Sequence, residues 1–258
     1  MKATHFKSSI GRLANMLFFG ILLTAVSNGQ AQSKTYSVEG FDKVIVSPHI
    51  SVTFIEGDTE SVVIESISEP LDKMNVEVEG KTLRLYLDGA KFVTKSERVE
   101  GEEWKGKRSI YKGTIATATV TYKTLEELSL RGEETFICQS PIAMEHFRLK
   151  IYGESQVYLN EVDLERLQTT IYGESYLELK EGRIGRQKIT AYGETRVNTL
   201  GVSSTSAKIT AYGEGSYRIK VSDRLKVTAY GEATVAYEGD PDVDKGIVIG
   251  EASIQKIY

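Results

Sequence analysis

The sequence has little cysteine, little proline and no recognisable amphipathic helix after its first thirty residues. Its single cysteine, Cys138, excludes an internal disulfide framework. Only four prolines interrupt a chain rich in Gly, Tyr, Val, Ile and Thr, and this composition favours strands. The two histidines after the N-terminal segment, His49 and His146, stand outside any motif, and no nucleophile elbow, phosphate loop or metal-ligand spacing is present. These absences predict an all-β protein that is not an enzyme and needs no cofactor.

The chain also lacks an excess of positive charge. Its formal net charge is −4, and residues 1–31 contain three basic residues and no acidic one. Without them, 29 basic residues remain against 36 acidic ones, a net charge of about −7. A nucleic-acid partner requires a basic stripe on the protein surface. The charge balance predicts no such stripe, and therefore no nucleic-acid partner.

The one long apolar run lies at the N-terminus. Lys2, Lys7 and Arg12 precede fourteen mostly apolar residues at 13–26, and small residues follow, with Gly29 and Ala31 at the −3 and −1 positions of a cleavage site. Fourteen residues are too few to span a bilayer comfortably. We therefore predict a signal peptide over residues 1–31, with a signal anchor as the alternative. The mature chain is expected to have no membrane span and to reach the periplasm, the outer-membrane surface or the extracellular space.

A repeat fills the C-terminal half. The tripeptide Tyr-Gly-Glu, or a close variant of it, recurs seven times, and successive glycines are 21, 20, 20, 20, 18 and 19 residues apart. The glycines are Gly132, Gly153, Gly173, Gly193, Gly213, Gly231 and Gly250. A constant period near 20 residues without a helical pattern inside it indicates one β-coil per repeat. The repeat therefore predicts a parallel β-solenoid.

Alternation along each strand predicts which residues point inward. In the repeat around Gly153, the residues two and four positions before and after the glycine are Leu149, Ile151, Ser155 and Val157, which are apolar or small. We expect these positions, the glycines themselves and Cys138 to face a narrow interior, with the glycine at a tight bend that has no room for a side chain.

The remaining positions form outward columns, because equivalent residues of stacked coils lie roughly 4.8 Å apart. Threonine occupies the third position before most glycines, tyrosine the position before, and glutamate the position after. The candidate binding residues are Tyr152, Tyr172, Tyr192, Tyr212, Tyr230, Glu154, Glu174, Glu194, Glu214 and Glu232.

Each column allows two interpretations. The tyrosines either stabilise the stack of coils or form a flat aromatic stripe that could stack against sugar rings or an apolar partner. The glutamates are either solvated carboxylates or ligands of divalent cations such as calcium, although the Asp-rich pattern of calcium-binding β-rolls is absent. We predict no catalytic residue and no dedicated metal site.

The N-terminal half reads as shorter strands without the tripeptide. Residues 36–88 contain five apolar or alternating runs separated by Gly, Asp and Glu, and we predict that they form irregular first coils that cap the solenoid. Residues 89–113 form a charged insertion, expected to be a protruding loop or hairpin, and the regular part follows over 114–258. Residues 32–258 are thus predicted to be a single domain.

The segments FDKVIVSPHISVTFIEGD (residues 41–58) and VEVEGKTLRLYL (residues 76–87), followed by coils of strand, glycine, small residue and strand, carry a family resemblance. Over residues 36–257 the chain resembles the bacterial auto-transporter adhesins with a head GIN domain. Members commonly have Ser-Gly-Ser or Ser-Gly-Ala where this chain has Tyr-Gly-Glu. The resemblance implies a right-handed parallel β-solenoid and a role in adhesion, and it transfers no catalytic residue.

These observations predict a binding or adhesion module that presents its tyrosine, threonine and glutamate columns to an extended partner, such as a glycan, a cell-surface polymer or an envelope protein. Two alternatives remain. Parallel β-helices also include polysaccharide lyases and glycosidases, which need a pair of carboxylates, or a carboxylate with basic residues, in a cleft. A purely structural scaffold of the cell envelope is the other.

Overall fold

Strands make up nearly all of the chain that the structure describes. The computed structural model describes residues 33–100 and 105–258, and the predicted signal peptide lies outside them. Within these ranges there is no α-helix, and a single 3-10 turn, η1, covers Leu71–Lys73. The predicted all-β solenoid is confirmed, with about six turns.

Nine strands precede the regular coils: β1 (Lys34–Ser37), β2 (Lys43–Val46), β3 (Ile50–Glu56), β4 (Ser61–Ile67), β5 (Met74–Glu79), β6 (Thr82–Leu87), β7 (Ser96–Glu100), β8 (Lys105–Ser109) and β9 (Ala116–Tyr122). Seven strands form the coils: β10 (Glu127–Gly132), β11 (Thr135–Cys138), β12 (Ile142–Gly153), β13 (Gln156–Tyr172), β14 (Tyr176–Tyr192), β15 (Thr195–Glu238) and β16 (Asp242–Lys256).

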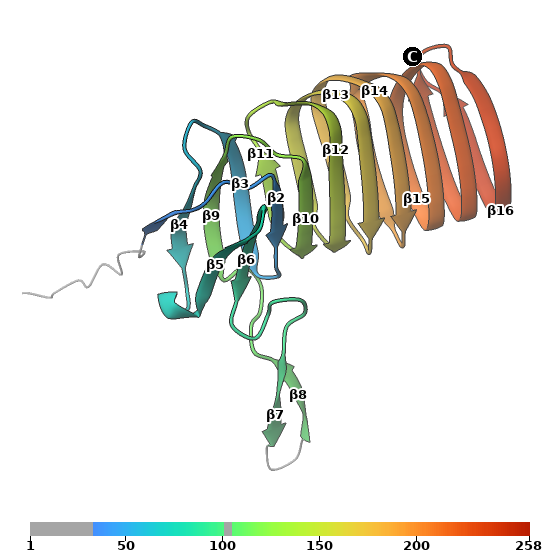
Figure 1. The fold of residues 1–258 in the computed structure, drawn as a ribbon. Helices are drawn as coiled ribbons and strands as arrows, with labels where there is room; N and C mark the ends of the chain where they lie inside the picture. The colour runs from blue at the N-terminus through green and yellow to red at the C-terminus, as the bar shows by residue number, and fades with distance from the viewer. Residues whose placement is uncertain (1–32, 101–104) are drawn as a thin grey trace, which may run out of the picture. The chain divides into compact units, whose positions relative to one another are not determined.

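The coils stack in parallel and in register (Figure 1). Strand β13 pairs with β12 and β14, and β14 pairs with β15, at a constant offset of one repeat. Gly132 lies opposite Gly153, and Gly231 lies opposite Gly250. Each repeat of the sequence is therefore one coil, and residues at the same position of the repeat form a column.

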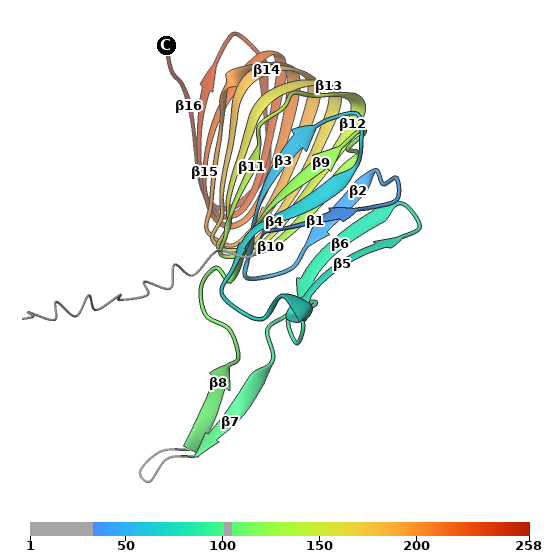
Figure 2. The same cartoon turned by 90° about the vertical axis from the view of Figure 1, so that its left-hand side faces the viewer.

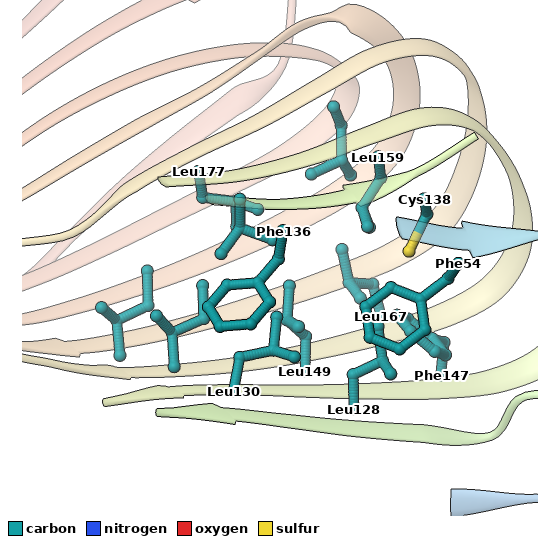
Figure 3. Close-up of a cluster of buried hydrophobic side chains, with 14 of the residues drawn as sticks. Phe54, Leu128, Leu130, Phe136, Cys138, Phe147, Leu149, Leu159, Leu167 and Leu177 are labelled. Atoms are coloured by element: carbon teal, nitrogen blue, oxygen red, sulfur yellow. The ribbon is translucent and has the colours of Figure 1, made fainter. Parts of the chain in front are cut away.

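The alternation of side chains places the core as predicted. Leu149, Ile151, Ser155 and Val157 are all buried, and so are Thr169 and the aliphatic residues at the same positions of later coils. Figure 3 shows part of this interior, where Phe54, Phe136 and Phe147 pack with leucines and with Cys138. Burial raises the pKa of the Cys138 thiol far above its ordinary value, so this cysteine is an unreactive core residue.

The repeated glycines are conserved between coils for a reason other than the one predicted from the sequence. They do not face the core, since Gly193 and Gly213 are exposed. Their φ angles lie between 107° and 128°, a region that other residues rarely adopt. A Cβ atom on Gly173 would also lie 2.3 Å from the carbonyl oxygen of Gly153 in the preceding coil. Close stacking of backbones at the corner, and not a narrow interior, requires glycine there.

In two coils the small residue two positions later bonds the same carbonyl. The Ser155 hydroxyl donates a hydrogen bond of 2.9 Å to the carbonyl of Gly132, and Ser175 does the same to Gly153. Later coils lack this bond, because the buried Thr195 hydroxyl has no partner and Gly215, Ala233 and Ala252 carry no hydroxyl. At Gly215 the ring of Tyr217 fills the space that a side chain would need.

The N-terminal strands do not stack in chain order (Figure 2). Strands β2 and β3 pair in parallel with β10 and β11 of the first marked coil. On their other side they pair with β6 and β9, which come later in the sequence. Beyond them, β5 pairs antiparallel with β6, and β4 pairs antiparallel with β9. Strand β1 pairs antiparallel with β4. We call residues 33–125 the cap. It closes one end of the solenoid.

Residues 89–113 contain the antiparallel pair β7–β8, which forms a sheet of its own. An ion pair of 3.0 Å joins Arg108 to Glu97 across the two strands. Both side chains are exposed, so this pair contributes little to stability.

Candidate functional site

The five tyrosines that precede the corner glycines form one continuous stack, which we call the tyrosine column (Tyr152, Tyr172, Tyr192, Tyr212 and Tyr230). Successive ring centroids are 5.2, 4.7, 4.7 and 4.8 Å apart, and successive ring planes differ by 3–5°. The column follows directly from the register, because each tyrosine lies opposite the tyrosine of the next coil. The three central side chains are 36–41% exposed.

This geometry decides which part of the rings a partner can reach. Each central ring has another ring against both of its faces at about one strand spacing. A sugar ring therefore cannot stack on these faces, as the flat-stripe interpretation required. The solvent-facing surface consists of ring edges and phenol hydroxyls, which donate and accept hydrogen bonds.

A cation continues the column into the cap. The Arg131 guanidinium lies over the ring of Tyr152 at 4.9 Å, and over Phe92 at 5.8 Å. Arg84 lies on Phe92 at 5.7 Å. At the opposite end, Ile249 lies opposite Tyr230. The stack is thus bounded by a cation–π contact on one side and an exposed aliphatic residue on the other.

Beside the tyrosines runs the predicted row of hydroxyls, made by Thr170, Thr190, Thr210 and Thr228, all half-buried. Lys150 replaces threonine in the first of these coils. Its ammonium group donates a 2.6 Å hydrogen bond to Glu127.

The glutamates after the corner line a groove of about 910 Å³. We call Glu154, Glu174, Glu194, Glu214 and Glu232 the glutamate column. The other groove residues include Gln156, Tyr176, Arg196, Ser216 and Thr234. In the part of the chain that the structure describes, no ion pair involves these glutamates. Their carboxylates are free to accept hydrogen bonds from a partner along the whole groove.

The groove brings carboxylates together in a row and not in a cage. Among residues 33–100 and 105–258 no group of three His, Cys, Asp or Glu side chains converges as a metal site would require. Calcium typically takes six to eight oxygen ligands, and a single row supplies few of them to any one point. The chemistry that this surface offers is therefore hydrogen bonding, through carboxylate acceptors and phenol hydroxyls.

Comparison with known proteins agrees with this architecture. Residues 40–241 match the family model described as "Putative auto-transporter adhesin, head GIN domain". The chain belongs to the head GIN domain family. No curated protein matches it.

Solved structures share the head GIN fold. A putative adhesin of Bacteroides fragilis NCTC 9343 superposes with a TM-score of 0.73 at 17% identity, covering 89% of this chain and 98% of that one. A putative adhesin of Parabacteroides merdae ATCC 43184 gives 0.64 at 20% identity, covering 90% and 98%. A protein of Parabacteroides distasonis ATCC 8503 named as a putative lipid binding protein gives 0.66 at 18% identity, with the same coverage. Identities this low establish a shared fold. In addition, no helix of the described residues is long and apolar enough to cross a membrane.

One buried acid of this head GIN domain was missed by the sequence reasoning. Glu134 occupies the inward position that serine or threonine takes in the next three coils, and it is buried at the junction with the cap. Burial raises the pKa of its carboxyl group, while backbone amides of Glu133 and His49 donate to it and oppose the shift. Its position in the repeat was readable from the sequence, but its contact with the His49 amide of the cap was not.

The two histidines lie in different parts of the described structure, His49 before β3 and His146 in β12. The two ring nitrogens of His49 contact the Gly113 carbonyl at 2.7 Å and the Thr94 hydroxyl at 2.6 Å, so the ring ties both ends of the insertion at 89–113 to the turn before β3. His146 lies exposed at the start of the same wall that carries the tyrosines. The His49 backbone amide contacts the Glu134 carboxyl group, whereas its ring nitrogens contact Gly113 and Thr94.

Proposed function

We propose that this chain is an exported, non-catalytic adhesion module that binds an extended, hydroxyl-rich glycan along the edge formed by the tyrosine and glutamate columns. Residues 1–31 act as its signal peptide, and residues 32–258 form one domain. Family membership supports the adhesion role. The partner class and the contact residues are the finer part of the proposal.

The stacked tyrosine column supports this proposal most directly. Its hydroxyls follow one another at the coil spacing, with a parallel row of unpaired carboxylates across the corner. A linear polymer lying along the solenoid axis would meet the same donors and acceptors at every coil. Weak contacts repeated in this way add through effective concentration.

The equivalence of the carboxylates favours binding over catalysis. A glycosidase needs two carboxylates with different environments, so that one is protonated while the other is not. Glu174, Glu194 and Glu214 are all exposed residues of one groove, and no ion pair of the described residues distinguishes one from another. No described histidine or basic residue other than Arg196 lines that groove.

The proposal is tested by removing the hydroxyls without removing the rings. The triple variant Tyr172→Phe, Tyr192→Phe and Tyr212→Phe keeps the stack, and the control variant carries Tyr36→Phe, Tyr237→Phe and Tyr258→Phe. Binding to the neutral polysaccharides laminarin, xylan and mannan is measured by biolayer interferometry, with melting curves for all proteins. We expect wild type and control to bind at least one of them, and the column variant to bind it at least about tenfold more weakly.

An unchanged affinity of the column variant, or no binding of wild type to any of the three polymers, would contradict the proposal. A companion variant with Glu174→Gln, Glu194→Gln and Glu214→Gln tests the carboxylates. Its control is Glu161→Gln with Glu181→Gln, which are exposed and do not line the groove. Release of sugars from any of the polymers would overturn the non-catalytic assignment.

A further inference from the structure

A second row of side chains runs along the same wall as the tyrosines, and it is basic. The register places Arg186 beside Arg166, and Lys208 beside Lys188. With Arg224 and Lys226 of the following coil these residues line a cleft of about 370 Å³. We call the six the cationic strip. The net charge of the chain predicted no basic stripe, and this prediction was wrong. A net charge sums over the whole chain, whereas the repeat places basic residues in one set of columns and glutamates in another.

Most of the strip has no neutralising partner. Asp244 alone pairs with two members, Arg224 at 3.3 Å and Lys226 at 2.8 Å. Within residues 33–100 and 105–258, no ion pair involves Arg166, Arg186, Lys188 or Lys208.

Acidic residues adjoin the strip only at its ends. Glu165 precedes Arg166 and Asp223 precedes Arg224, whereas the two coils between carry Gly185 and Thr205 at this position. Positive charges one strand spacing apart, roughly 4.8 Å, repel each other and gain nothing from the fold. The central coils therefore hold an uncompensated line of charge parallel to the solenoid axis.

We propose that the cationic strip binds a linear acidic polysaccharide, with its carboxylate or sulfate groups on the basic side chains. The columns run along the axis, which suits an extended chain. The threonines at 190 and 210 lie one column nearer the corner and can bond sugar hydroxyls. The glutamate column lies farther on, beyond the tyrosines, and repels the polymer from that side.

Other polyanions fit this surface less well. Single-stranded nucleic acid gains much of its affinity from bases stacked on aromatic faces, and the faces of the tyrosine column are covered by one another. An anionic membrane is a plane, and contact with the whole wall would bring the exposed glutamates of the corner against lipid headgroups of the same sign. The strip and the tyrosine–glutamate edge are separate surfaces, and neither proposal depends on the other.

The test compares the purified chain with the variant Arg186→Gln, Lys188→Gln and Lys208→Gln. The control variant, Lys81→Gln, Lys123→Gln and Lys220→Gln, removes the same charge from exposed lysines elsewhere. The probes are polygalacturonate, its neutral methyl ester, a single-stranded DNA oligonucleotide, and vesicles containing phosphatidylglycerol. Melting curves verify that each variant folds, as expected for exposed side chains.

We expect wild type and control to bind polygalacturonate more tightly than any other probe, with affinity that falls as salt rises. The strip variant should bind it at least about tenfold more weakly, and the tyrosine-to-phenylalanine column variant should bind it as wild type does. The proposal is overturned if wild type does not bind polygalacturonate, if the control loses as much affinity as the strip variant, or if DNA or vesicles bind more tightly.

Discussion

The cap and the coils both bury one face of many strands, but their strands pair in different patterns. In the coils every strand pairs in parallel with the strand one repeat away, so that a column contains the same position of each repeat. In the cap, β2 pairs with β6 and β10, which lie on either side of it in space but both follow it in sequence. Antiparallel strands then close the end.

The difference decides what each region can present. Column geometry repeats any outward side chain at every coil, which generates the tyrosine column, the glutamate column and the cationic strip. The cap repeats nothing, and several of its polar side chains make individual hydrogen bonds instead. Ser47, for example, donates 2.7 Å to the Lys91 carbonyl, and Tyr111 donates 2.9 Å to the Asp88 carbonyl. The coils repeat their outward side chains along the solenoid axis, and the cap closes one end of the solenoid.

The largest expected difference between the regions concerns glycine. Gly173→Ala places a methyl group 2.3 Å from a backbone oxygen at a φ of 113°, and we expect it to lower the free energy of unfolding by about 3 kcal/mol. Gly80 in the cap also has a positive φ, 61°, but nothing lies within 4 Å of its added methyl. Gly80→Ala should cost about 1 kcal/mol. Urea denaturation measures both, and equal losses would contradict the stacked-corner explanation.

The next contrast concerns tyrosine. Tyr192→Ala removes two ring–ring contacts and should cost about 2 kcal/mol, whereas Tyr192→Phe keeps both rings and should be nearly neutral. In the cap, loss of a tyrosine hydroxyl should be costly, because the Tyr111 hydroxyl donates a hydrogen bond to the Asp88 carbonyl. Tyr111→Phe should cost about 1 kcal/mol. Thermal melting of the three variants separates a contribution of the ring from one of the hydroxyl; a costly Tyr192→Phe would mean that the column is held together by its hydroxyls.

Removing one buried polar pair from the coils is expected to raise stability, unlike the preceding substitutions. Gln187 is 2% exposed in a column otherwise filled by Phe147, Leu167 and Ala207, and its Oε1 atom has no partner. Its amide donates to the Ser204 hydroxyl. Replacing both residues, Gln187→Leu with Ser204→Ala, should raise the free energy of unfolding by about 1 kcal/mol. Denaturation in urea measures the gain.

The control for that gain is the cap. Ser47→Ala removes a buried hydroxyl whose bond is made, so it should lose about 1 kcal/mol. A loss of stability in the Gln187–Ser204 double variant would contradict the assignment of a net cost to this pair and to its unpaired Oε1 atom.

The smallest effect is expected at the junction, where Glu134 links coil and cap. Its pKa in the folded chain is raised above the ordinary value of 4.5 by burial, so the folded state binds the proton more tightly than the unfolded state. Stability should therefore fall as the pH rises from below 4.5 through the raised pKa, and level off above it. Glu134→Gln should flatten this part of the curve of melting temperature against pH; an unchanged slope would assign it to other groups.

The sequence predicted the coils well and the cap poorly, for a physical reason. A period of 20 residues fixes which residues are neighbours, so the burial of Leu149 and Ile151 and the columns of Tyr172 and Glu174 followed from counting. Local packing could not be counted. The exchange of serine for Gly215 depends on the ring of Tyr217. The faces of the tyrosine rings are covered because neighbouring rings are nearly parallel, and the order of residues in the sequence does not give this angle.

In the cap, strands were visible in the sequence but their partners were not. The run around Val44 and the run around Leu83 alternate equally well, and nothing in either says that they pair in parallel. The cationic strip was missed for a third reason. Arg186 and Lys188 belong to one coil and Lys208 to the next, and their charges join only when the coils stack.

The threading of the cap has a consequence for the order of folding. Contacts in the coils join residues about 20 positions apart, whereas the bond from the Ser51 hydroxyl to the Thr135 carbonyl spans 84 positions. Contacts of short separation form fastest. We therefore expect β2 and β3 to join the first coil only after the coils have formed, although β2 and β3 are synthesised first. For a chain that crosses a membrane with its N-terminus leading, β2 and β3 have no coil to join until residues 127–138 have also crossed.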